Sequence, residues 1–181
     1  MFLFADSEIT ADALPEILAQ MHRSFHATQQ MVEKNQICGC TACIGAGGLK
    51  IKVVAHYGQA LVRTIRRVHE LTGECVIVAH RMLKNDVPIP EYALLSEEVA
   101  RMARPEMKCR LVPSRLNLES FGEVQVSYLD LKSLAGEIPP ATTAPWLLRY
   151  IAYVWHGVQA IPYRLGLKKP LEQFRNVPAL P

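Results

Sequence analysis

Long hydrophobic runs, low-complexity tracts and internal repeats are all missing from the sequence. A membrane-spanning helix needs about 20 mostly apolar residues, so we exclude a polytopic membrane protein. Charge of one sign is also scarce, because 20 Lys and Arg stand against 17 Asp and Glu, a formal net charge of +3. That excess is too small to favour nucleic acid as a partner. With 50% hydrophobic and 20% charged residues among 181, the composition is that of a globular protein.

We also expect no secretory leader. The chain starts with the apolar run Met1–Ala5, which has no basic flank and stops at Asp6, whereas a signal peptide needs a positive start and a longer apolar stretch. We interpret the run as a buried β-strand. Five cysteines without a leader predict reduced thiols and a cytoplasmic protein.

Hydrophobic periodicity predicts alternating helices and strands. Residues 11–34 repeat apolar positions at steps of three and four, which indicates a helix with Pro15 in its first turn and His22 and Arg23 on its solvent face. Strict alternation after it predicts strands, with residues 49–57 and 60–68 joined as a hairpin. The later elements are expected to be a helix at 73–85, a strand at 92–95, a helix starting at Ser96 and a hairpin over 116–128. This order predicts an α+β fold.

The composition changes after residue 135, so we divide the chain into an α+β domain, residues 1–135, and a tail, residues 136–181. The tail contains seven of the twelve prolines and both tryptophans, and its five basic and two acidic residues give it the whole excess of +3. One helix is expected at residues 146–161. It is suited either to contact with an anionic membrane surface or to covering the open side of the sheet, and we favour the second interpretation.

Two segments carry a family resemblance: residues 49–58 (LKIKVVAHYG) and residues 70–88 (ELTGECVIVAHRMLKNDVP), preceded by the cysteine motif CGCTAC at 38–43. They resemble a bacterial family of uncharacterised domains, which is in turn similar to the class III adenylate/guanylate cyclase catalytic domain. The resemblance covers residues 1 to about 130. It implies a ferredoxin-like, cyclase-type antiparallel sheet with helices on one face, incomplete at the N-terminus, and a homodimer.

The cyclase residues do not carry over well. The resemblance places the metal-binding aspartates before Met1. It places the transition-state asparagine on Ile77, which cannot form a side-chain hydrogen bond. The transition-state arginine is present as Arg81, and the base-selecting position falls on Glu70. We therefore expect a non-catalytic binding or interaction module, with Glu70, Arg81 and Lys84 as candidate nucleotide contacts. The alternative is a nucleotidyl cyclase or nucleotide-processing relative whose metal-binding segment lies upstream of Met1.

Three thiols crowd into six residues at Cys38, Cys40 and Cys43. Zinc is the possible cofactor here, with Cys75, Cys109 or a histidine as fourth ligand, because structural zinc sites use four nitrogen or sulfur donors. A redox pair of Cys40 and Cys43 is a second interpretation, although such a motif normally opens a helix. The spacing is not that of paired CxxC motifs, so we favour reduced, inert thiols over both.

Overall fold

The computed structural model describes residues 7–37, 41–65 and 68–168. The strand predicted for Met1–Ala5 therefore lies outside the described residues. The chain divides into two compact units: the first contains Met1–Thr28 and Gly48–Pro140, and the second contains Gln29–Gly47 and Ala141–Pro181. Each unit is described by itself.

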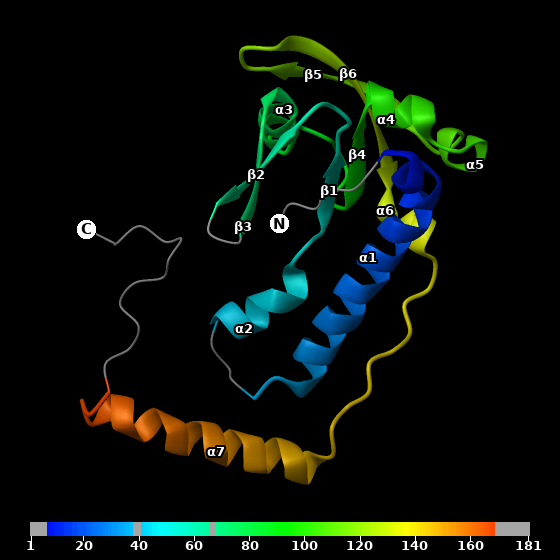
Figure 1. Ribbon diagram of the computed structural model, residues 1–181. Helices are drawn as coiled ribbons and strands as arrows, with labels where there is room; N and C mark the ends of the chain where they lie inside the picture. Colours follow the sequence, from blue (N-terminus) through cyan, green and yellow to red (C-terminus); the bar gives the residue numbers. More distant parts are fainter. Residues whose placement is uncertain (1–6, 38–40, 66–67, 169–181) are drawn as a thin grey trace. The chain divides into compact units, whose positions relative to one another are not determined.

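The centre of the first unit is a four-stranded mixed sheet in the order β1-β4-β6-β5 (Figure 1). Strand β1 (Lys52–Ala55) runs parallel to β4 (Tyr92–Ser96), whereas β4 pairs antiparallel with β6 (Gly122–Asp130), which pairs antiparallel with β5 (Val112–Leu118). The turn between β5 and β6 contains Ser120 and Gly122, with φ values of 71° and 75°, a conformation that glycine adopts readily. A separate two-stranded sheet pairs β2 (Leu61–Ile65) with β3 (Val68–Thr72).

Within the described residues, five helices contribute to this unit. The longest is α1 (Ser7–Asn35), which starts in the first unit and ends in the second. The others are short and lie between or after the strands: α3 (Glu74–Met82), α4 (Glu97–Met102), α5 (Pro105–Lys108) and α6 (Leu131–Ala135). These elements confirm the predicted α+β class.

Strand β4 is the centre of the core, and all five of its residues are buried. Because side chains alternate along a strand, Ala93 and Leu95 pack with Leu14 and Leu18 of α1 on one side. Tyr92 and Leu94 pack with Met82 of α3, Leu118 and Val126 on the other side. The expectation that helices lie on one face was therefore wrong, since both faces of β4 are covered. Burying each leucine stabilises the fold by about 1.5–3 kcal/mol.

The predicted hairpin of residues 49–57 with 60–68 was also wrong. Strand β1 pairs with β4, and β2 pairs with β3, because local alternation predicts a strand without predicting its partner. Pro15 lies inside α1 rather than in its first turn, since the helix starts at Ser7. The helix at 73–85, the strand at 92–95 and the hairpin at 116–128 are confirmed by α3, β4 and the β5–β6 pair.

The second unit contains the end of α1, α2 (Thr41–Gly45), a 3₁₀ turn that starts at Ala46, and α7 (Trp146–Arg164). Side chains near the end of α1 hold the segment that leads into α7: Lys34 Nζ donates to the Ala141 carbonyl at 3.0 Å, and Asn35 Oδ1 accepts from the Ala144 N–H at 2.8 Å. Helix α7 confirms the tail helix expected at 146–161 and extends one turn beyond it. None of the helices in the described part of the chain combines the length and the hydrophobicity that a membrane-spanning segment requires.

Candidate metal centre

Two histidines continue the buried stripe of α1. Leu14 and Leu18 pack in the core, and the next positions at steps of four are His22 and His26. Residues four apart lie on the same helix face, so both imidazoles point to the same side as the leucines. His22 is 2% exposed, which corrects our expectation that it lies on the solvent face.

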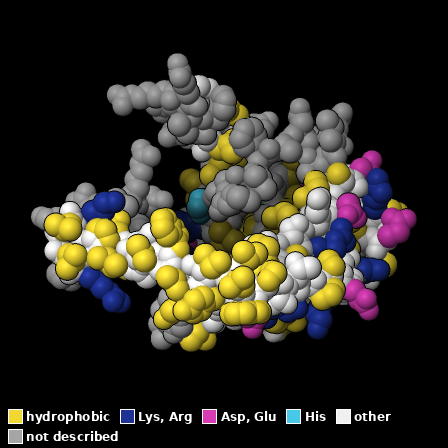
Figure 2. All heavy atoms as spheres, turned by 90° about the horizontal axis from the view of Figure 1, so that it is seen from below, with side chains coloured by type: hydrophobic (Ala, Val, Ile, Leu, Met, Phe, Trp, Pro, Cys, Tyr) yellow, Lys and Arg dark blue, Asp and Glu magenta, His cyan; other side chains and the backbone are white. Residues whose placement is uncertain are grey.

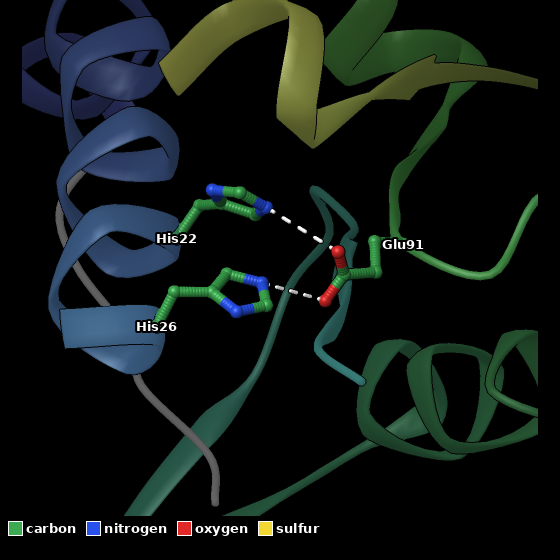
Figure 3. A group of neighbouring side chains, drawn as sticks. All are labelled: His22, His26 and Glu91. Atoms are coloured by element: carbon green, nitrogen blue, oxygen red, sulfur yellow. Dashed lines mark hydrogen bonds and ion pairs between the residues drawn. The ribbon is translucent and has the colours of Figure 1, made fainter. Parts of the chain in front are cut away.

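A carboxylate from a distant part of the chain meets both rings. Glu91 immediately precedes the buried strand β4, and its backbone carbonyl accepts a hydrogen bond from the Leu131 N–H at 3.4 Å. Because β4 is fixed by core packing, the Glu91 side chain is held beside α1 (Figure 3). We call His22, His26 and Glu91 the His–Glu cluster.

The donor atoms of the His–Glu cluster converge on one point. His26 Nε2 lies 2.8 Å from Glu91 Oε1, and His22 Nε2 lies 3.5 Å from Glu91 Oε2. The two imidazole centroids are 4.4 Å apart. One donor atom from each residue can be chosen so that all three lie within 4.8 Å of one another. Ligands on a tetrahedral zinc ion are about 3.3 Å apart, given zinc–ligand distances of about 2.0–2.2 Å, so small side-chain shifts suffice to seat such an ion.

Burial and neighbouring charges set the protonation states that a metal site needs. Desolvation lowers the pKa of His22 from 6.5, and the adjacent His26 lowers it further, while Glu91 opposes both. Burial alone raises the pKa of Glu91, but the Ile51 N–H (3.3 Å from Oε1), His26 and Lys50 together bring that pKa below its ordinary value. A neutral imidazole beside an ionised carboxylate is a donor set for a divalent transition metal.

His22 also has buried ring nitrogens whose hydrogen-bonding capacity is not satisfied. Neither of its ring nitrogens has a hydrogen-bond partner among the described residues, because 3.5 Å to Glu91 is long for a hydrogen bond. An unpaired polar group in the interior costs about 1–3 kcal/mol. A metal ion bound at Nε2 would supply a partner for that nitrogen, although not for Nδ1. Three nitrogen and oxygen ligands with a fourth position left over suit Zn²⁺, and two histidines with one carboxylate also suit Fe²⁺.

Of the three nucleotide contacts expected from the resemblance, the structure describes the side chains of Arg81 and Lys84. The Arg81 guanidinium donates to the carbonyl oxygen of Glu119 and pairs with its carboxylate at 2.9 Å. A cleft of about 500 Å³ lies nearby, lined by His56, Cys75, Ser96 and other residues, but neither Arg81 nor Lys84 lines it. The side chain of Glu70 is outside the described part of the chain, so this site stays a prediction.

The cysteine loop also stays a prediction. Cys38 and Cys40 lie outside the described residues, and Cys43 is half-buried in α2. Of the proposed fourth ligands, Cys75 lines the cleft and Cys109 is exposed.

Sequence reasoning missed the His–Glu cluster, although one signal was present. The spacing His-x-x-x-His within a predicted helix places two imidazoles on one face, and both follow the leucine stripe in register. Glu91 has no comparable signal, since it lies 65 residues from His26 and meets it only through the fold.

The first unit is thus an α+β domain with a candidate metal centre, and comparison with known proteins identifies its family. Residues 1–92, which include the whole His–Glu cluster, match the family model described as "Protein of unknown function (DUF2652)". The chain is 33% identical over 162 residues to the "Uncharacterized protein Rv2561/Rv2562" of Mycobacterium tuberculosis, and the match covers 87% of this chain and 74% of that protein. The chain belongs to the DUF2652 family. No solved structure matches it.

Proposed function

We propose that this protein is a non-catalytic binding module whose first unit holds one Zn²⁺ ion through His22, His26 and Glu91. The observation that carries the proposal is the buried His22 imidazole, which lacks a hydrogen-bond partner among the described residues and faces the same carboxylate as His26. Neutral imidazole nitrogen and ionised carboxylate oxygen are ligands that zinc prefers.

The exposure of the three side chains favours a structural role for the ion over a catalytic one. The side chains of His22, His26 and Glu91 are 2%, 12% and 11% exposed, so the fourth ligand of the ion would be a buried water rather than a substrate. An ion at this position joins α1 to the start of β4, two segments far apart in the chain. Metal binding that requires the folded arrangement stabilises the fold by the free energy of binding.

Calorimetric titration of the chelator-treated protein with Zn²⁺ tests the proposal. We expect one ion per chain, and we expect His26→Gln to abolish or strongly weaken this binding. His156→Gln is the matched control, because His156 is an exposed histidine of the second unit and its replacement should leave the titration unchanged. Equal zinc binding by the wild-type chain and the His26→Gln variant contradicts the proposal.

The cysteine loop is a competing zinc site, and Co²⁺ distinguishes the two. Cobalt bound by thiolates has intense sulfur-to-metal charge-transfer bands in the near ultraviolet, whereas cobalt bound by imidazole and carboxylate lacks them. We expect a visible cobalt spectrum without these bands. A thiolate spectrum that is lost when Cys38, Cys40 and Cys43 are changed to serine would assign the metal to the loop instead.

We also propose that the fold is of the cyclase type and that the module self-associates without performing cyclase chemistry. The mixed sheet with its β5–β6 hairpin supports the first part. Ile77 is 50% exposed on α3 and has no side-chain donor, and Arg81 is already paired with Glu119.

Incubation with ATP or GTP and Mn²⁺ should yield no cyclic nucleotide, and sedimentation should detect a homodimer. Cyclic nucleotide in that incubation would refute the absence of cyclase chemistry, and a purely monomeric protein would refute self-association.

A further inference from the structure

Helix α7 carries an exposed apolar ridge along its length. The ridge consists of residues spaced four and three apart, which lie on one helix face: Leu147, Ile151, Val154, Val158 and Ile161. Their exposed fractions run from 45% to 54%. Figure 2, in which α7 faces the viewer, shows hydrophobic side chains along much of the helix. We call this set the α7 ridge.

The opposite face of α7 is the polar one. Arg149 and His156 are seven residues apart and therefore share a face, and Arg164 lies in the last turn. Within the second unit, Trp146, Arg149, Tyr150 and Tyr153 line a shallow depression together with Gln36 and Ile37. No residue of the α7 ridge lines that depression, so the ridge and the side of the helix that borders the depression are different faces.

Charge and aromatic content distinguish α7 from an ordinary apolar helix. Residues 138–171 contain four basic residues and no Asp or Glu. The two tryptophans of the chain, Trp146 and Trp155, are 76% and 61% exposed on α7, and three of the six tyrosines are in the same helix. Tryptophan and tyrosine concentrate where lipid headgroups meet acyl chains, because their rings are apolar and their N–H or O–H groups are polar.

From these observations we propose that α7 is a peripheral membrane anchor, which lies in the plane of an anionic lipid surface with the α7 ridge among the upper acyl segments. Helices of this kind combine a hydrophobic face with a basic face and insert to a depth of about 5–10 Å. The positive charges of Arg164 and Lys168 meet anionic headgroups, and long basic side chains reach the headgroups while their stems cover apolar surface.

The charge pattern favours a membrane over a protein partner or a second copy of this chain. A second copy presents another acid-free basic helix, so two α7 helices that paired side by side would bring like charges together. An anionic bilayer offers both the apolar layer that the ridge needs and the opposite charge that the flanks need. Attraction of this type weakens as salt screens it.

Intrinsic tryptophan fluorescence reports on α7 alone, because both tryptophans of the chain are in this helix. We expect the full-length protein to show a blue shift on addition of phosphatidylcholine vesicles that contain phosphatidylserine, and to sediment with them. With pure phosphatidylcholine vesicles, or at high salt, the shift and the sedimented fraction should fall severalfold. No shift with anionic vesicles overturns the proposal.

Ile151→Glu tests the α7 ridge directly, and Ile77→Glu is its matched control. The two isoleucines are 54% and 50% exposed on helices of different units, so the same substitution should leave the fold intact in both. Because the charge would enter the acyl layer, we expect Ile151→Glu to weaken vesicle binding by about tenfold or more and Ile77→Glu to leave it unchanged. Zinc binding should survive in both variants.

Two outcomes overturn the proposal and assign the ridge elsewhere. If Ile151→Glu binds anionic vesicles as tightly as the wild type, the ridge is not the contact. The other outcome is that the wild type does not bind vesicles but the Ile151→Glu variant differs from it in solution. A changed sedimentation coefficient would then mean that the ridge packs against a second copy, and a lowered melting temperature that it packs against the chain itself.

Discussion

Replacement of Glu91 by glutamine separates the role of the carboxylate charge from the role of its shape. Glutamine has nearly the same size and retains an oxygen that can accept from the Ile51 N–H, now 3.3 Å from Oε1. It removes the negative charge that faces His26 at 2.8 Å and His22 at 3.5 Å. Without metal, the loss of one charge-assisted contact should cost about 1–2 kcal/mol of unfolding free energy.

Zinc should amplify the difference between the two proteins. At a free concentration one hundred times its dissociation constant, a ligand that binds only the folded state stabilises it by about 2.7 kcal/mol. For a chain of this length, that corresponds to a rise in melting temperature of about 5–10 °C. We expect this rise in the wild-type protein and a much smaller one in Glu91→Gln, measured by scanning calorimetry with and without Zn²⁺.

Glu137→Gln is the control for this measurement, because Glu137 is exposed and does not belong to the group of described side chains that could share a metal ion. Its melting temperature should follow that of the wild type at every zinc concentration. An equal zinc-dependent rise in Glu91→Gln and the wild type refutes the reasoning, since the ion would then be bound without the carboxylate.

The burial or exposure of single side chains leads to three further predictions. Burial lowers the pKa of His22 from 6.5 in the folded protein, so the unfolded chain takes up a proton first as the pH falls below 6.5. The unfolding free energy of the metal-free protein should therefore decline below that pH. Denaturant titrations should show a shallower decline in His22→Leu. Leu94→Ala, at a fully buried position, should cost about 2–5 kcal/mol, whereas Leu83→Ala, at a position 48% exposed, should cost under about 1 kcal/mol in the same assay. Arg81→Gln should cost under about 1 kcal/mol, because its partner Glu119 is 89% exposed, and a larger loss would mean that Arg81 has a structural role.

Elements with strong local patterns were predictable from the sequence. Val124, Val126 and Tyr128 alternate along β6, and the glycine at 122 marks its turn, so the hairpin was located correctly. The same kind of reasoning failed for β1, because Val53 and Val54 are both partly buried and the strand pairs with β4 across a long crossover. A strand's partner is decided by packing on both faces, which local periodicity does not contain.

The candidate site was less predictable than the fold. Histidine is polar, so we placed His22 on the solvent side, whereas the structure buries it at the end of a leucine stripe. Glu91 reaches His22 and His26 only because it immediately precedes β4. That strand runs through the core, and its start lies beside α1. Tertiary placement of this kind cannot be derived from spacing, although the histidine pair at i and i+4 was a usable signal.

X-ray absorption at the zinc edge tests the central claim most directly, because it identifies the atoms bound to the ion in the intact protein. For the His–Glu cluster it should detect only nitrogen and oxygen ligands at about 2.0–2.2 Å, with the outer-shell scattering of two imidazoles. Sulfur ligands at about 2.3 Å, or a spectrum unchanged in His26→Gln, would contradict the account.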